Sequence, residues 1–234
     1  MQVALFLAYD GSHYFGSQIQ NTLPTIQGAL HQVLQALQIE PKTDFSGRTD
    51  KGVHATMQVV SLKLPSFWSD LTRLQTTLNK MLPHDIEVKK IIQVNDDFHA
   101  RYSAKKRVYR YIISTARPSV FTANYVSYIK DVDFVALQEK IKLFEGKYDF
   151  CCFAKSGSDV KTTTREIYKA FAYKHKNYII LYFEANGFLR TQIRLMVGAL
   201  IQHNADTIKM MLQQQCKKIK PAPPQGLYLA KIKY

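Results

Sequence analysis

The feature that most constrains the fold is an apolar stripe along residues 25–39, because its spacing is that of one face of an α-helix. The stripe consists of Ile26, Leu30, Val33, Leu34 and Leu37. Prolines just before and just after this segment mark its ends. A helix of this kind has to pack its apolar face on a sheet, and the alternating residues 2–9 predict a buried strand of that sheet.

The remainder of the first hundred residues continues the succession of strands and helices. Residues 57–64 and 86–94 have the pattern of strands, and residues 69–80 have the pattern of a helix. The order strand, helix, strand, strand, helix, strand is that of a ferredoxin-like α+β unit. We therefore expect a first domain over residues 1–100.

Residues 101–234 are expected to form a second α+β half. Strands are predicted over residues 107–113, 165–173 and 178–184, with a last strand that ends at Tyr234. Two helices are predicted from apolar side chains at helical spacing, Val135, Leu137, Ile141 and Phe144 in one and Ile193, Met196, Val197, Leu200 and Ile201 in the other. The polar residues 155–164 predict a loop.

The charge balance indicates a polyanionic partner. The 234 residues contain 32 Lys and Arg against 18 Asp and Glu, a net charge of +14 that favours nucleic acid over a membrane surface. Residues 101–117 contain six basic side chains and no acidic one, and tyrosines alternate with them on strand 107–113. Such a strand suits an RNA-facing sheet, with cations for phosphates and rings for unstacked bases. The alternative is a solvated edge strand that is basic to prevent aggregation.

The cysteines and the N-terminus indicate the cellular compartment. Cys151, Cys152 and Cys216 fit neither a disulfide framework nor a CxxC metal site, and an adjacent pair with one odd thiol suits a reducing compartment. The N-terminal apolar run lacks a basic segment and stops at Asp10, so no signal peptide is expected. No stretch approaches the ~18–20 apolar residues of a membrane span. We therefore expect a cytoplasmic protein that does not associate with membranes.

Residues 45–55 (FSGRTDKGVHA) form the segment richest in reactive groups. A cation, a hydroxyl, a carboxylate and an imidazole lie close together there, with glycines that permit a tight turn. Asp50, two residues after Arg48, could be held ionised and orientated by that arginine. The alternative interpretation is a polar turn whose surface ion pair contributes little.

Residues 47–55 (GRTDKGVHA) resemble the active-site motif of the tRNA pseudouridine synthase A family. Further stretches resemble motifs of the same family in the same order, namely residues 9–20, 78–86, 98–104, 149–153, 186–198 and 221–229. The resemblance therefore covers nearly the whole chain. The chain departs from the family at Ser17, Lys51 and Tyr148, where the family favours Trp, Ala and His, and around residues 191–192.

The resemblance implies a reaction that breaks the N1–C1′ bond of uridine, turns the base and joins C5 to C1′, without a cofactor or a metal. Asp50 would be the central carboxylate, and it would either attack C1′ or remove the C2′ proton. Arg48 would orientate Asp50 and hold it ionised, and Arg194 would pair with it from the second half. Tyr109 would stack on the uracil, with Tyr111 as the alternative on the same strand face.

The remaining site residues are implied in the same way. Those expected to bind the substrate are Tyr109, Arg101, Lys105, Arg107, Arg110 and Arg190. Arg190 and Arg194 are four residues apart and are expected on one helix face, where a bound anion would offset their repulsion. Thr49 and His54 are expected to shape the loop rather than to transfer protons, and His99 is expected to shape the hinge between the halves rather than to bind a metal.

The architecture implied by the resemblance is two tandem ferredoxin-like, RRM-like halves whose antiparallel sheets join across a central basic cleft. The protein would be a homodimer that modifies tRNA in the anticodon stem-loop, at positions 38–40. The alternative from another class is a non-catalytic RNA-binding or tRNA-folding protein that uses the same basic sheet.

Overall fold

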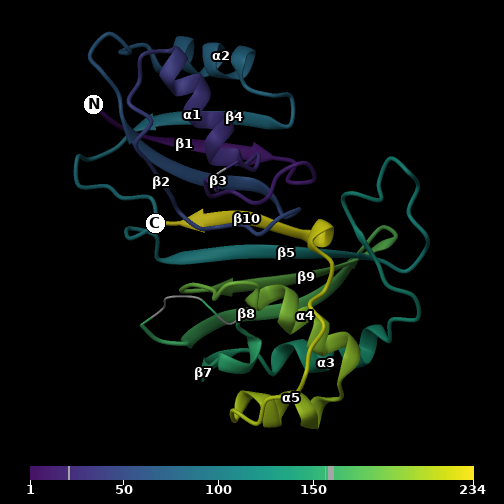
Figure 1. Ribbon diagram of the computed structural model, residues 1–234. Helices are drawn as coiled ribbons and strands as arrows, with labels where there is room; N and C mark the ends of the chain where they lie inside the picture. The colour runs from purple at the N-terminus through teal and green to yellow at the C-terminus, as the bar shows by residue number, and fades with distance from the viewer. Residues whose placement is uncertain (21, 156, 158–160) are drawn as a thin grey trace. The chain divides into compact units, whose positions relative to one another are not determined.

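A computed structural model describes residues 1–20, 22–155, 157 and 161–234 of the chain (Figure 1). The chain divides into two compact units, Met1–Lys105 together with Tyr228–Tyr234, and Lys106–Leu227. Each unit combines helices with a mostly antiparallel sheet, which confirms the predicted α+β class. Residues 156 and 158–160 of the predicted polar loop lie outside the described residues.

The first unit has the predicted order strand, helix, strand, strand, helix, strand. Its elements are β1 (Gln2–Tyr9), α1 (Ile26–Ala36), β2 (Thr43–Phe45), β3 (His54–Lys63), α2 (Leu71–Met81) and β4 (Ile86–Gln93), followed at the end of the chain by β10 (Leu227–Lys233), which belongs to this unit from Tyr228 onward. Strand β1 lies between β3 and β4 and is antiparallel to both. Figure 1 shows α1 in front of these strands and α2 beside β4. This is the ferredoxin-like arrangement that the pattern predicts.

Helix α1 buries the apolar stripe from which its position is predicted. Ile26, Leu30 and Leu34 are almost fully buried. The Oγ1 atom of Thr25 accepts a hydrogen bond from the Gly28 N–H at 3.1 Å and so caps the N-terminus. The regular helix ends at Ala36, three residues earlier than predicted.

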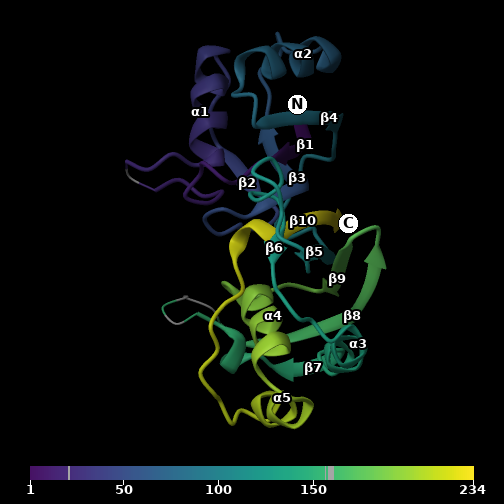
Figure 2. The same cartoon turned by 90° about the vertical axis from the view of Figure 1, so that its right-hand side faces the viewer.

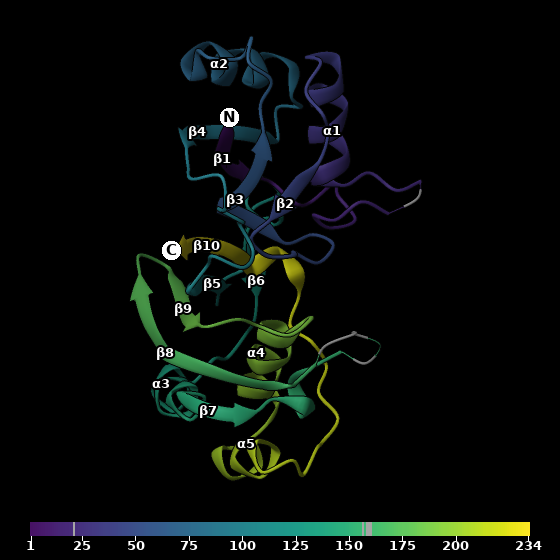
Figure 3. The same cartoon turned by 90° about the vertical axis from the view of Figure 1, so that its left-hand side faces the viewer.

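Strand β3 pairs with different partners along its length (Figure 3). Its later residues pair antiparallel with β2, so that Phe45 lies opposite Val60. Its first residues pair in parallel with β10, so that His54 lies opposite Tyr228. The loop of residues 46–53 therefore leaves β2 and returns at the start of β3, next to the last strand of the chain.

The second unit is built on a four-stranded antiparallel sheet in the order β5-β9-β8-β7, and β6 is added in parallel to β5. Figure 3 shows β7 running beside β8. The elements in chain order are β5 (Lys106–Ser114), β6 (Ser127–Tyr128), α3 (Phe134–Lys142), β7 (Gly146–Asp149), the 3-10 turn η1 (Cys151–Phe153), β8 (Thr164–His175), β9 (Tyr178–Ala185), α4 (Gln192–Gln202), α5 (Ala205–Leu212) and the 3-10 turn η2 (Pro224–Gly226).

Helices α3 and α4 of the second unit lie next to each other (Figure 2). The Lys140 side chain donates hydrogen bonds to the carbonyl oxygens of Leu200 and His203 and so joins the two helices. Two of the apolar residues from which these helices are predicted are exposed, Val135 in the first turn of α3 and Ile201 in the last turn of α4. Among the described residues, no helix is long and apolar enough to cross a membrane.

One prediction about the cysteines is wrong. Cys152 and Cys216 form a disulfide with their Cα atoms 5.0 Å apart, whereas Cys151 is a free thiol. The two bonded residues are 64 positions apart in the sequence, in η1 and after α5. The tertiary fold brings them together, and spacing along the chain carries no sign of this pairing.

Candidate active site

The loop of residues 46–53, the catalytic loop of the sequence prediction, is attached to β3 through a buried glutamine. The Gln58 Oε1 atom accepts a hydrogen bond from the Ser46 hydroxyl at 2.6 Å, and its Nε2 donates to the Gly47 carbonyl at 2.8 Å. The Ser46 N–H donates to the Val59 carbonyl at 2.9 Å. Gln58 and Ser46 are almost fully buried, so the start of the loop is fixed to the sheet.

Thr49, the residue before Asp50, is held from two sides. Its Oγ1 atom lies 2.9 Å from the Tyr9 hydroxyl at the end of β1. Its N–H donates to Ser17 Oγ at 2.9 Å, and its carbonyl accepts from the Ser17 N–H at 3.1 Å. Ser17 is 1% exposed, so both bonds lie away from solvent. The backbone that carries Asp50 is therefore orientated by neutral, buried groups.

The loop after β1 approaches the catalytic loop so closely that only glycine fits at two positions. A Cβ atom on Gly11 would lie 2.1 Å from the Val53 carbonyl oxygen. A Cβ atom on Gly16, whose φ is +104°, would lie 2.7 Å from the Thr49 carbonyl oxygen. These glycines let the two backbones pack directly against each other.

His54 closes the loop as the first residue of β3, and it is 1% exposed. Its Nδ1 accepts a hydrogen bond from the Gly11 N–H at 3.1 Å. Its ring stacks on Tyr228 of β10 with 4.7 Å between ring centroids. Asp10 Oδ1 lies 3.1 Å from the same nitrogen. Burial within these contacts suits a residue that shapes the loop.

Asp50 and Arg48 lie on the accessible side of the loop. Asp50 is half-buried and Arg48 is exposed. The predicted orientation of the Asp50 carboxylate by Arg48 stays a prediction. The ammonium group of Lys51 lies 3.8 Å from the centroid of the Phe15 ring, which it covers.

Two tyrosines near the loop keep their hydroxyl protons at neutral pH. Burial raises the pKa of Tyr9 to about 12. Burial, together with a 2.6 Å hydrogen bond to Asp85, raises the pKa of Tyr14 well above its ordinary value. The Tyr9 hydroxyl therefore acts as a hydrogen-bonding group that positions Thr49, and the Tyr14 hydroxyl as one that binds Asp85.

In the second unit, the structure separates the two candidate tyrosines of β5. Tyr111 is fully buried, and its hydroxyl lies 2.5 Å from Ser127 Oγ and donates to the Pro223 carbonyl at 2.8 Å. Burial raises the pKa of Tyr111 well above its ordinary value. Tyr109 is 8% exposed and meets the Phe188 ring edge-on at 5.3 Å. Tyr111 is fully enclosed in the core, and Tyr109 is the less buried of the two tyrosines.

The two predicted arginines near α4 do not share a helix face. Arg190 precedes the helix and is exposed, and Thr191, with a left-handed φ of 63°, separates it from the first turn. Arg194 lies in the helix, where its Nε donates to the Ala222 carbonyl at 2.8 Å. The prediction of one face is wrong because α4 begins only at Gln192.

The basic residues of β5 are divided between the two faces of its sheet, because side chains alternate along a strand. Arg107 lies on the face of Tyr109, and Arg110 lies opposite Tyr182 on the other. Lys106 forms an ion pair with Glu184 at 3.4 Å, so it has a structural partner. One face of β5 therefore carries Arg107 together with Tyr109, and the other carries Lys106 together with Arg110.

Arg107 and Arg165 form a cationic pair near the turn after β9. Arg107 donates to the Asn186 carbonyl at 2.8 Å. Burial, followed by repulsion from Arg107, lowers the pKa of Arg165. An anion beside the two guanidinium groups would relieve this repulsion.

The other predicted substrate-binding residues, Arg101 and Lys105, are exposed at the end of the first unit. Arg101 lies 5.7 Å from the centroid of the Tyr102 ring, and Tyr102 is 76% exposed. His99 Nδ1 accepts the Arg101 N–H at 3.1 Å. Exposed cations and an exposed ring are available here to nucleic acid.

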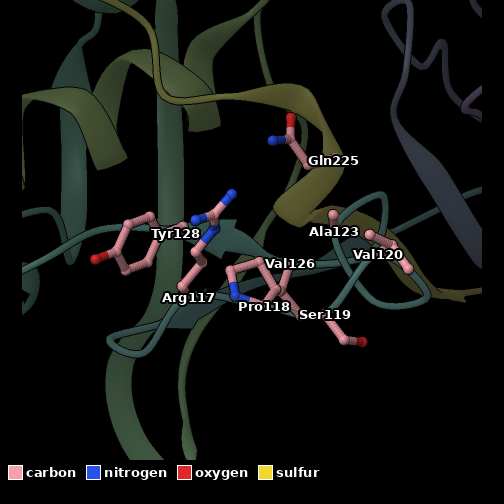
Figure 4. Close-up of a pocket in the computed structure, with 8 residues that line it drawn as sticks. All are labelled: Arg117, Pro118, Ser119, Val120, Ala123, Val126, Tyr128 and Gln225. Atoms are coloured by element: carbon pink, nitrogen blue, oxygen red, sulfur yellow. The ribbon is translucent and has the colours of Figure 1, made fainter.

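Two further features lie outside the predicted site. Figure 4 shows a hollow in the second unit, lined by Arg117, Pro118, Ser119, Val120, Ala123, Val126, Tyr128 and Gln225, and none of the predicted site residues lines it. Among the described residues, the group of side chains spaced to hold a metal ion is Cys151, Cys152 and Cys216. The catalytic loop contributes to neither feature.

The sequence interpretation did not identify Gln58, Ser17 or Tyr9 as parts of the site. One signal was present for Gln58, since it is a polar residue next to the apolar run Val59–Val60 of a predicted strand. Ser17 and Tyr9 lie in the stretch 9–20 that resembles a family motif, but their contacts with Thr49 could not be predicted because they depend on the approach of the loop after β1 to the catalytic loop.

Comparison with known proteins gives a consistent result over the whole chain. A sequence model of the family described as tRNA pseudouridine synthase matches residues 5–103 and 141–234. A protein named tRNA pseudouridine synthase A from Wolinella succinogenes is 42% identical over 98% of this chain and 93% of its own length. Proteins of the same name are 41% identical in Campylobacter jejuni, over 100% of both chains, and 36% identical in Geobacillus sp., over 97% of this chain and 96% of the relative.

Among solved structures, a Cbf5-Nop10-Gar1 complex is similar over 85% of this chain and 45% of the matched chain, with 12% identity and a TM-score of 0.42. This likeness is too distant to carry an argument.

Proposed function

The chain belongs to the tRNA pseudouridine synthase family, and we propose that it isomerises uridine to pseudouridine in the anticodon stem-loop of tRNA, at positions 38–40. The observation that carries the proposal is the position of Asp50. Its carboxylate is accessible on a loop whose flanking residues Ser46, Thr49 and His54 are buried and hydrogen-bonded. A reactive group that is accessible on a fixed backbone is the arrangement that orientation-dependent catalysis requires.

The isomerisation conserves all the atoms of the nucleotide except for the exchange of one proton. The N1–C1′ bond breaks, the base turns, C5 joins C1′, and the proton on C5 leaves while N1 gains one. We propose that Asp50 takes the part of the carboxylate, either by attack on C1′ or by removal of the C2′ proton. The reaction consumes no oxidant and no nucleotide energy source.

The second unit would supply the other groups of the reaction. We propose that Tyr109 stacks on the uracil near C5, which the burial of Tyr111 supports. Arg194 is proposed to pair with Asp50 in the substrate complex. We propose that Arg48, which is exposed, orientates Asp50 and holds it ionised, and that it helps to occupy the position of the displaced base.

The tRNA backbone would be bound by the exposed or half-exposed basic residues of both units, namely Arg101, Lys105, Arg107, Arg110 and Arg190. The repulsion between Arg107 and Arg165 supports a phosphate-binding place near the turn after β9. A homodimer in the cytoplasm is part of the proposal by resemblance to the family. The joining of the two units across a basic cleft stays a prediction.

The experiment that tests the function measures tritium release from tRNA carrying [5-³H]uridine, without any added cofactor. Release accompanies formation of the C5–C1′ bond. Wild type should release tritium, and Asp50→Asn should release none while it retains tRNA affinity, because the substitution removes the reactive carboxylate and keeps its shape. Asp96→Asn is the matched control, since Asp96 is an exposed carboxylate of the same unit.

The outcomes separate the candidate functions. Release by the wild type alone, followed by mapping of the modified positions, would support both the carboxylate and the anticodon location. Release by both wild type and Asp50→Asn would mean that the reactive group is a residue other than Asp50. Tight tRNA binding with no release by either protein would favour the non-catalytic RNA-binding alternative.

A further inference from the structure

Three sulfur atoms meet in the second unit at a place that the proposed reaction does not use. Cys151 and Cys152 belong to η1, and Cys216 follows α5. The three Sγ atoms all lie within 4.8 Å of one another. Cys151 and Cys152 are half-buried and Cys216 is exposed, so an ion in solution can reach them.

The backbone on the η1 side of this cluster is fixed by the core. Phe150 and Phe153 are fully buried, and Phe144 meets the Phe153 ring edge-on with 5.3 Å between centroids. Asp149 Oδ1 accepts a hydrogen bond from the Cys151 N–H at 2.9 Å. Two of the three sulfur atoms are therefore presented by a turn with little freedom to move.

The segment that follows Cys216 is bound to the end of α4. Gln202 Nε2 donates to the Lys220 carbonyl at 2.7 Å, and Gln202 Oε1 accepts from the Lys220 N–H at 3.0 Å. His203 Nε2 lies 3.2 Å from the Lys218 carbonyl oxygen. The third sulfur atom is thus held near the other two by contacts that do not depend on the disulfide.

We propose that the reduced protein binds one Zn²⁺ ion through Cys151, Cys152 and Cys216. Zn–S bonds of about 2.3 Å in tetrahedral geometry place neighbouring sulfur atoms about 3.8 Å apart, a spacing compatible with the observed cluster. Three thiolates suit zinc, which accepts sulfur ligands readily. The fourth position would be taken by water, since the cluster opens to solvent.

The ion and the disulfide exclude each other, because a sulfur atom of a disulfide is not a thiolate. A phosphine reduces the Cys152–Cys216 bond by giving two electrons, and with one water molecule the products are two thiols and a phosphine oxide. Binding of Zn²⁺ then displaces three thiol protons and leaves a complex of charge −1. Lys217 and Lys218, the next residues after Cys216, are exposed cations that can offset this charge.

The site is tested on the full chain in two states, phosphine-reduced and with the disulfide intact, after removal of bound metal. Zn²⁺ is titrated against a chromophoric chelator, and Co²⁺ is titrated separately, because thiolate-to-cobalt absorption reports sulfur ligation. The reduced chain should bind one ion. The oxidised chain should bind none at this site, because it keeps only the Cys151 thiol.

Cys151→Ser is the most informative variant, because it leaves the disulfide of the oxidised chain in place. Since loss of a residue that only supports a ligand already weakens metal binding about 10–100-fold, loss of a ligand should weaken Zn²⁺ binding by about 100-fold or more. Cys216→Ser should have the same effect, and His203→Gln, beside the same segment, should have none. The proposal is overturned if the reduced wild type binds no stoichiometric ion, or if Cys151→Ser binds Zn²⁺ as tightly as wild type.

Discussion

Ser17 and Gln58 fix the backbone on either side of Arg48 by buried hydrogen bonds, whereas Arg48 and Asp50 themselves remain accessible. In this arrangement neutral groups position the loop, and the charged groups proposed to react are accessible. A buried neutral bond keeps its geometry when a polyanion arrives, because it has no net charge to respond to the field of the phosphates. The geometry of the loop that carries Asp50 therefore depends on buried residues on either side of it.

Ser17→Ala should lower both stability and turnover. The substitution leaves the buried Thr49 N–H without its 2.9 Å acceptor, which costs about 1–3 kcal/mol. Because Thr49 precedes Asp50, the rate of tritium release should fall several-fold while tRNA affinity changes little. Urea unfolding and tritium release measure the two effects. Ser66→Ala, at an exposed serine of the same unit, is the control, and an equal response of the two variants would contradict the positioning role.

Gly11→Ala should destabilise the protein by about 1–3 kcal/mol, as overpacking does elsewhere. The added Cβ would lie 2.1 Å from the Val53 carbonyl oxygen, and a backbone atom cannot rotate out of the way. Gly187→Ala is the matched control, because the nearest atom to its Cβ is Arg165 Nε at 3.7 Å, an ordinary contact. Equal urea midpoints for the two variants would show that the close approach is not obligatory.

At the scale of elements, α1 is joined to β2 by a histidine whose protonation affects the stability of the fold. His31 Nε2 lies 2.7 Å from Thr43 Oγ1, and burial lowers the pKa of His31 below its ordinary value. The unfolded chain therefore binds a proton at a higher pH than the folded chain does. The contribution of neutral His31 to stability is complete above pH ~6.5 and is lost as the pH falls toward the folded-state pKa.

His31→Gln should reduce the loss of stability on acidification. Glutamine is neutral at every pH. The urea midpoint of this variant should therefore change less than that of wild type between pH ~6.5 and pH ~5. His84→Gln removes an exposed histidine of the same unit and should keep the wild-type slope. Parallel pH profiles for wild type and His31→Gln would exclude this contribution.

The longer elements could be predicted from the sequence because their own apolar spacing encodes them. Helix α1 and strand β1 bury the residues that the pattern selects. The short strand β2 was assigned no residues, and the short strands β6 and β7 and the eight-residue helix α5 were not predicted, since two to four residues of strand and about two turns of helix give too few repeats of their periods. The start of α4 was missed because the left-handed φ of Thr191 leaves no mark in the apolar pattern.

At the scale of the whole molecule, contacts between segments that are distant in the sequence could not be predicted from local sequence patterns. The return of β10 to β3 and the meeting of Cys152 with Cys216 join residues that share no periodicity. Asp50 and Arg48 could be identified as candidates because their motif is contiguous. The contacts of Ser17 with Thr49 could not be predicted from the sequence, because they depend on how two loops pack against each other.

The net charge of +14 predicts that tRNA affinity falls steeply with salt, because each phosphate contact releases a counterion. Arg190→Ala should lower the slope of log K against log salt by about 1 if Arg190 contacts a phosphate. Lys147→Ala is the matched control, since it removes the same charge from an exposed position on β7 and should leave the slope unchanged. Filter binding across a range of salt concentrations measures both. Equal slopes for the two variants would mean that the protein attracts tRNA through its overall field alone and that Arg190 makes no specific contact.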